Sequence, residues 1–116
     1  GRWFKSSRPD QKQYMKQKLK IFYTTISDKK KAKEFSENLL NNKEIICINV
    51  FNDISSFYSE NNRVVKVQEV VLIIKTFLSK KKLKSIVYRY HPYEIPFLAQ
   101  INSKLLSDKY YKWASK

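Results

Sequence analysis

The chain has 116 residues, which is the size of one compact domain and makes a second domain improbable. A hydrophobic content of 42% and an aromatic content of 15% exclude a disordered chain, which buries too little apolar surface to offset the entropy of ordering. The formal net charge of +14 makes an acidic partner, such as nucleic acid, phosphate or anionic lipid, the first hypothesis. However, nearly all of the excess is lysine, whereas recognition of bases and phosphates favours arginine. The charge is therefore more typical of a lysine-rich proteome.

The cysteine content and hydropathy bound the cellular context. The single cysteine, Cys47, excludes an internal disulfide framework and a zinc ribbon, as expected in a reducing compartment. No stretch approaches the roughly 18 to 20 apolar residues that cross a bilayer. We expect a cytoplasmic protein that does not insert into membranes.

The first residues look separate from the domain. Met15 is the only methionine and directly precedes the first apolar alternation, so residues 1–14 resemble an appended remnant or an upstream extension. We expect residues 15–116 to form a single domain. Its first strand is predicted over 19–26, which is rich in β-branched and aromatic residues. Ser27 or Asp28 then caps a helix that ends at Asn41 and Asn42. The apolar face of that helix comprises Ala32, Phe35, Leu39 and Leu40.

The middle of the chain predicts a long hairpin. Segments 44–51 and 54–58 read as a second and a third strand. Asn61-Asn62 tolerates positive φ and predicts a turn into a fourth strand over 64–76.

The last third predicts a helix, a strand and a short helix. Ser79 caps a helix whose apolar residues are Leu83, Ile86, Val87 and Tyr90. A final strand is expected over 97–102 and a short amphipathic helix over 107–114. The resulting fold class is α+β, a ferredoxin-like βαββαβ sandwich with a long central hairpin and a C-terminal helix.

Neither face of the central strands is polar. In the fourth strand, Val71 and Ile73 lie on one face, and Val70, Leu72 and Ile74 lie on the other. The second strand sets Ile46, Ile48 and Val50 opposite Ile45, Cys47 and Phe51. An antiparallel sheet with one solvated face alternates apolar and polar residues instead. We therefore expect a second copy to cover the other face in a closed homo-oligomer.

Few residues suggest chemistry. His91, the only histidine, lies in a stiff loop with Tyr93 and Glu94, where a metal site and a simple helix-terminating turn are the two alternatives. Cys47 lies in an apolar strand, and with His91 it supplies too few ligands for tetrahedral zinc. Nucleophile elbows and phosphate-binding loops are absent because Gly1 is the only glycine. We expect no enzymatic activity and no catalytic residue.

Five short sequence blocks stand in order between residues 18 and 113. They are Cys47-Ile48-Asn49-Val50, Ser56-Phe57-Tyr58, Glu69 with Ile74-Lys75-Thr76, His91-Pro92-Tyr93-Glu94-Ile95-Pro96, and Tyr110 to Trp113. In this order and spacing, they resemble the CutA divalent-cation tolerance family. The resemblance implies a PII-like homotrimer and a role in the response to metal ions, with copper binding reported for some members. Where enterobacterial members have a proposed copper-ligand cysteine, this chain has Thr24, and Tyr90 replaces the first residue of a histidine pair.

The resemblance leads to one main functional hypothesis. It is a cytoplasmic homotrimer that binds copper or another divalent metal ion, or a small polar ligand, in clefts between subunits. His91 is the candidate metal ligand and Cys47 a second candidate, whereas Lys75, Tyr93, Glu94 and Trp113 are the candidate cleft residues. The alternative is a non-specific anion or nucleic-acid binder, or a trimeric scaffold, driven by the basic surface. Aromatic residues do not interleave regularly with basic ones on a strand, so specific RNA binding is weakly supported.

Overall fold

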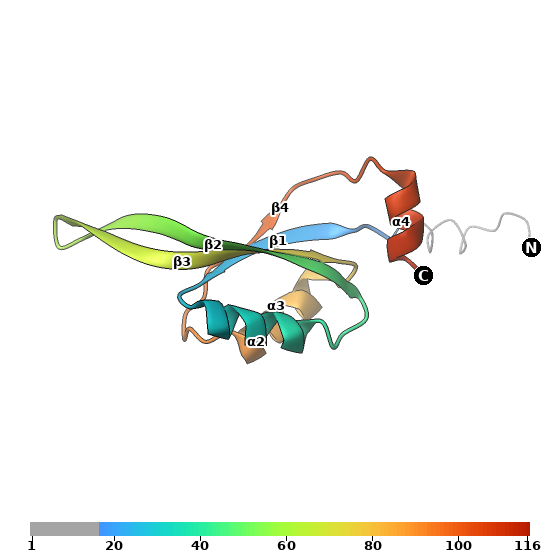
Figure 1. Ribbon diagram of the computed structural model, residues 1–116. Coiled ribbons are helices and arrows are strands. Elements are labelled where there is room, and N and C mark those ends of the chain that lie inside the picture. Colours follow the sequence, from blue (N-terminus) through green and yellow to red (C-terminus); the bar gives the residue numbers. More distant parts are fainter. Residues whose placement is uncertain (1–16) are drawn as a thin grey trace, which may run out of the picture.

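The computed structural model describes residues 17–116, so the predicted extension at 1–14 lies outside the described residues. Strands and helices follow one another in the order β-α-β-β-α-β-α (Figure 1). The elements are β1 (Lys20–Ile26), α2 (Lys29–Leu39), β2 (Ile45–Glu60), β3 (Arg63–Thr76), α3 (Lys80–Tyr90), β4 (Leu98–Ile101) and α4 (Asp108–Ala114).

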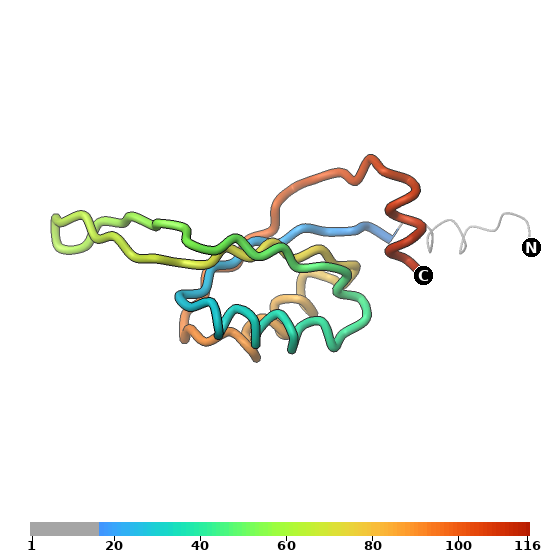
Figure 2. Tube along the Cα trace, in the orientation of Figure 1, coloured from blue at the N-terminus to red at the C-terminus, as the bar shows by residue number. Residues whose placement is uncertain are grey.

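The strands form one antiparallel sheet in the order β2-β3-β1-β4. At its centre, Tyr23 pairs with Ile73 of β3 and with Ala99 of β4. Both long helices, α2 and α3, cover the same face of the sheet, whereas the segment after β4 arches over the opposite face before α4 (Figures 1 and 2). The predicted ferredoxin-like fold is confirmed. None of the helices within residues 17–116 is long and apolar enough to cross a membrane.

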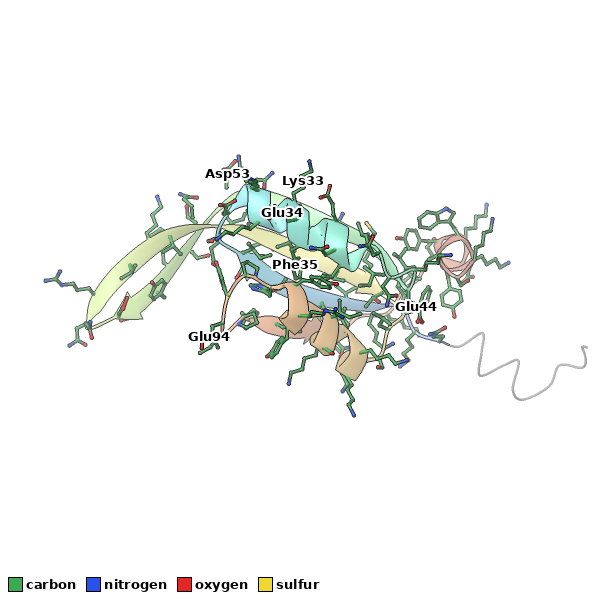
Figure 3. All side chains as sticks on the ribbon, turned by 90° about the horizontal axis from the view of Figure 1, so that it is seen from below. Lys33, Glu34, Phe35, Glu44, Asp53 and Glu94 are labelled. Carbon is green, nitrogen blue, oxygen red and sulfur yellow. The ribbon has the colours of Figure 1, made fainter. Side chains whose placement is uncertain are left out.

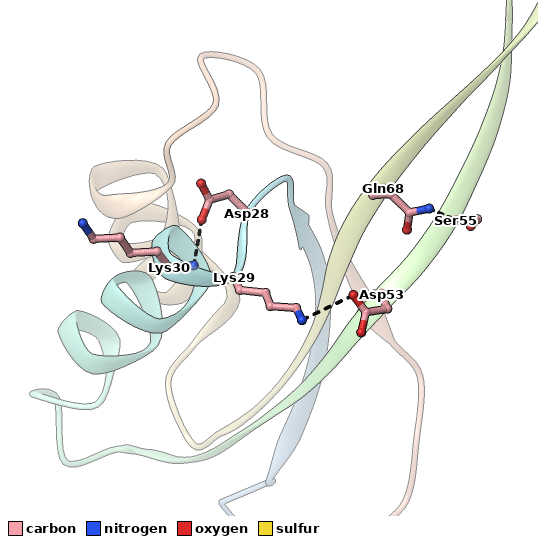
Figure 4. A network of polar contacts seen from close by, with 6 residues as sticks. All are labelled: Asp28, Lys29, Lys30, Asp53, Ser55 and Gln68. Carbon is pink, nitrogen blue, oxygen red and sulfur yellow. Dashed lines mark hydrogen bonds and ion pairs between the residues drawn. The ribbon is translucent and has the colours of Figure 1, made fainter.

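Side-chain caps begin both long helices as expected. Asp28 accepts hydrogen bonds from the backbone N–H groups of Lys30 (2.7 Å) and Lys31 (3.1 Å), which lower the pKa of its carboxyl group. Ser79 accepts one from the N–H of Lys82 at 3.2 Å. At the start of α2, Lys29 also forms an ion pair with Asp53 of β2 (3.4 Å; Figure 4). This pair connects the helix start to β2. It contributes little stability because both partners are exposed.

The second and third predicted strands are a single strand, β2, and their prediction as separate elements was wrong. Asp53 has a φ of 61°, and the register shifts between Phe51 and Ile54. The ladder resumes at the pair Ile54–Glu69, so the irregularity is a bulge and not a break. The turn prediction is confirmed, since Asn61 and Asn62 have φ values of 52° and 62° and connect the pair Glu60–Arg63. This hairpin continues beyond the helices as an arm (Figure 1).

The core lies between the sheet and the two helices. Figure 3 shows Phe35 between α2 and α3. The buried cluster comprises Phe22, Ile26, Ala32, Phe35, Leu39, Ile45, Val70, Leu72, Ile74, Leu78, Leu83 and Val87. Ile45 belongs to this cluster, which corrects its predicted grouping with Cys47, because the register shifts between these two residues. Leu40 and Tyr90 were expected on the apolar helix faces, but both lie at helix ends and are exposed.

The opposite face of the sheet is apolar but only partly covered. Val71 is buried and Ile73 half-buried, whereas Phe51, beside Val71 in the ladder, is 50% exposed. On the arm, Phe57 is 64% exposed and Val64 78%. Helices α2 and α3 thus cover one face of the sheet, whereas apolar side chains stay open at Phe51 on the other face and at Phe57 and Val64 on the arm, which continues beyond the helices.

Leu72→Ala tests which face holds the core. Leu72 is fully buried, so removing its side chain should lower the free energy of unfolding by about 2 to 5 kcal/mol. Leu40→Ala is the matched control, because it deletes the same atoms from a side chain that is 44% exposed. Chemical denaturation of both variants measures the difference. Equal losses would contradict the placement of the core.

Candidate functional site

The loop after α3 positions the only histidine against β1. Helix α3 ends at Tyr90, and its C-cap residue His91 donates its backbone N–H to the carbonyl of Val87 at 2.8 Å. Pro92 prevents a further helical turn. This ending turns the imidazole inward, so that the residue is only 7% exposed. The ring packs edge-on against Phe35 of α2, with 5.5 Å between ring centroids.

Both nitrogens of the imidazole have partners inside the chain. The backbone N–H of Tyr93 donates to Nδ1 at 3.1 Å, so the proton must reside on Nε2. Nε2 then donates to the carbonyl of Thr25 at 2.9 Å and also lies 3.1 Å from Oγ1 of Thr24. Thr24 in turn donates to the carbonyl of Phe97 at 2.7 Å. Thr24, which stands at the position where the resemblance places a cysteine in enterobacterial members, therefore contacts the histidine.

Burial favours the neutral form of this ring. Desolvation lowers the pKa of His91 below its ordinary value of 6.5, and this effect outweighs the opposing contribution of the Thr25 carbonyl. A neutral imidazole is the form that binds metals, but His91 must first release one of its present hydrogen-bond partners.

Tyr93 connects the loop to the base of the arm. Its hydroxyl donates to Oε2 of Glu69 at 3.0 Å, while Ser56 donates to Oε1 at 2.7 Å. Burial and the Glu69 hydrogen bond raise the pKa of Tyr93, and a hydrogen bond involving Ser27 acts in the opposite sense. Glu69 and Ser56 were not among the predicted site residues. The register of the hairpin could have predicted their contact, because it sets Ser56 diagonally across from Glu69.

The predicted cleft residues form two separate groups. Tyr93 packs edge-on against His91, with 4.9 Å between ring centroids, and the exposed Glu94, labelled in Figure 3, follows in the same loop. Lys75 lies at the other end of the sheet, with its Nζ 5.7 Å from the ring centroid of Tyr110. Tyr110 lies 5.4 Å from Trp113, measured between ring centroids, so Trp113 belongs to the second group. The two groups are separated by the distance from Glu69 to Lys75, which is six positions of β3, or roughly 20 Å at about 3.3 Å per residue.

The second metal candidate, Cys47, lies with the Lys75 group. Cys47 pairs with Lys75 in the β2–β3 ladder, far from the loop of His91. Within residues 17–116, no group of three or more His, Cys, Asp or Glu side chains is placed to hold a metal ion. A complete site with these residues as donors requires further ligands from another molecule.

Comparison with known proteins identifies the family. The model of the CutA1 divalent ion tolerance protein family matches residues 20–116. This chain belongs to the CutA1 family. The CutA divalent-cation tolerance protein of Thermococcus kodakarensis is 32% identical over 97 residues, which is 83% of this chain and 92% of the relative.

Solved CutA1 structures agree with the fold. The Ehrlichia chaffeensis protein superposes with a TM-score of 0.75 at 27% identity, covering 86% of this chain and 94% of the other. CutA1 from Oryza sativa gives a TM-score of 0.74 at 27% identity, covering 84% and 90%. The CutA1 family is described by tolerance of divalent ions and not by a reaction.

The lowered pKa of His91 predicts how stability depends on pH. Between pH 6.5 and the lower folded-state pKa, the unfolded chain binds more protons, so stability falls as the pH decreases through this window. Stability from this residue is fully present above pH 6.5. Thermal unfolding at pH 7.5 and 5.5 should show that the midpoint temperature of the native chain falls at the lower pH. The midpoint temperature of His91→Gln should fall less. Parallel curves for the two proteins would contradict the assignment.

Proposed function

We propose that this chain acts as a homotrimeric divalent-cation tolerance protein that binds copper or another divalent ion, or a small polar ligand, in clefts between subunits. The observation that supports it most is the exposed apolar surface on the sheet face opposite the helices and on the arm. Contiguous exposed apolar surface usually marks an interface. The trimeric state and the PII-like plan follow the CutA resemblance. A non-enzymatic role in the cytoplasm is part of the same proposal.

A cyclic trimer also accounts for the separation of the candidate residues. In a cyclic trimer, each interface joins two different patches, one from each neighbouring subunit. The Tyr93–Glu94 end of one subunit then meets the Lys75–Trp113 end of the next. Residues about 20 Å apart within one chain thus line a common cleft between two chains.

The proposed metal donors lie in the loop after α3. Glu94 is exposed and free to coordinate, and His91 lies three positions before it. Imidazole and carboxylate are suitable donors for copper and zinc. His91 joins the site by exchanging its hydrogen bond to Thr25 or Tyr93 for the metal, and the neighbouring subunit supplies the missing ligands.

Replacing Ile73 by Asp tests the assembly. Ile73 lies in β3 on the face opposite the helices, beside Tyr23. If a second subunit covers it, the aspartate becomes a buried, unpaired charge that costs several kcal/mol. Light scattering should then give a trimer for the native chain and a monomer or an aggregate for Ile73→Asp. Lys33→Asp in the exposed part of α2 is the control and should remain a trimer.

Calorimetric titration with copper and zinc tests the metal site. We expect saturable binding in the micromolar range or tighter that is lost in His91→Ala and weakened in Glu94→Gln. Glu34→Gln, an exposed carboxylate of α2 labelled in Figure 3, should leave binding unchanged. Circular dichroism shows whether each variant is folded. No binding heat in the native trimer would refute the metal-binding part of the proposal.

A further inference from the structure

A cleft of about 300 Å³ lies between the sheet and the segment that follows β4. One wall comes from β1, its preceding residue and β3, and the other from the segment between β4 and α4 and from the start of α4. Figure 2 shows the path of this segment over the sheet. The lining residues are Leu19, Ile21, Lys75, Ser103, Lys104, Leu105, Leu106, Ser107 and Tyr110. The volume is at the lower end of the range of small-molecule sites.

Most of the lining is apolar. Four aliphatic side chains and the ring of Tyr110 form the apolar part of the wall, and two serines and two lysines supply the polar groups. An adjoining cleft of about 630 Å³ shares Leu19, Ser103, Lys104 and Leu105. The apolar surface at Leu19 and Leu105 therefore continues from one cleft into the other. Such a surface favours a ligand with an apolar body.

The charged groups of the cleft are both cations. Among residues 17–116, Lys75 and Lys104 line it and no acidic residue does. Lys75 Nζ lies over the ring of Tyr110 at 5.7 Å from the centroid, and no carboxylate within the described part of the chain pairs with it. A half-buried lysine that has no anionic partner among the described residues, next to an apolar wall, selects an anion and disfavours a metal cation.

We propose that this cleft binds a small organic monoanion, a carboxylate or a sulfonate, with an apolar body. The headgroup pairs with Lys75, and the body lies against Ile21, Leu106 and Tyr110. This inference rests on the proposed function, in which Lys75 lines a ligand cleft, and it names the class of that ligand.

The test compares two dyes of similar shape on the full chain in its native assembly. 1-Anilinonaphthalene-8-sulfonate carries one negative charge, and N-phenyl-1-naphthylamine lacks it. Fluorescence titration should give saturable binding of both dyes. Lys75→Met should weaken the sulfonate about tenfold, the loss expected for one charge-assisted hydrogen bond, and leave the neutral dye unchanged. Leu106→Ser should weaken both dyes.

Two controls separate the pocket from general effects. Lys66→Met removes a lysine from the arm, outside the cleft, and should change neither dye. Lys75→Arg keeps the charge and should retain sulfonate binding even if Lys75→Met folds poorly. Equal weakening of the two dyes by Lys75→Met, or no binding of the sulfonate to the native assembly, would overturn the proposal. Light scattering and copper titration on the same samples report separately on the proposed function, so its failure is distinguishable.

Discussion

Strand β3 carries apolar side chains on both faces, and the rest of the molecule depends on this constraint. Side chains alternate along a strand, so Val70, Leu72 and Ile74 cannot share a face with Val71 and Ile73. Helices α2 and α3 cover the first set. The second set is only partly covered by the described chain. Because burial of apolar surface contributes about 25 cal/mol per Å², the open face provides a driving force for association that a monomer does not use.

The spacing of apolar residues, together with the residues typical of caps and turns, allowed most of the fold to be predicted. Asp28, Ser79 and the pair Asn61-Asn62 are local signals, and each acts in the structure as its residue type suggests. The continuity of β2 was not predictable in this way. Asp53 looks like a strand breaker in the sequence, but pairing with β3 on both sides of it holds the strand together. That pairing depends on residues far away in the chain, and so does the place of Ile45 in the core.

The candidate site was less predictable than the fold. The sequence brings His91, Tyr93 and Glu94 together because they are neighbours in the chain. The partners of this loop come from elsewhere: Thr24 and Thr25 from β1, and Glu69 from β3. Nothing local in the sequence indicates that both ring nitrogens of His91 are occupied. The alternatives of a metal ligand and a loop anchor therefore depend on tertiary contacts, here the hydrogen bonds of the imidazole to Thr25 and Tyr93.

Charge separates two kinds of chemistry along the sheet. The net charge of +14 opposes cations, although screening over about 8 Å at physiological ionic strength limits the effect to short range. A bound metal must therefore rely on local donors, and Glu94 is the open one because Ser56 and Tyr93 already occupy Glu69. At the opposite end, Lys75 and Lys104 favour an anion. If unlike ends meet in a cyclic assembly, the lysines at one end of each sheet face the carboxylate of Glu94 on the next subunit, so the same charge separation that distinguishes the two sites also favours their pairing.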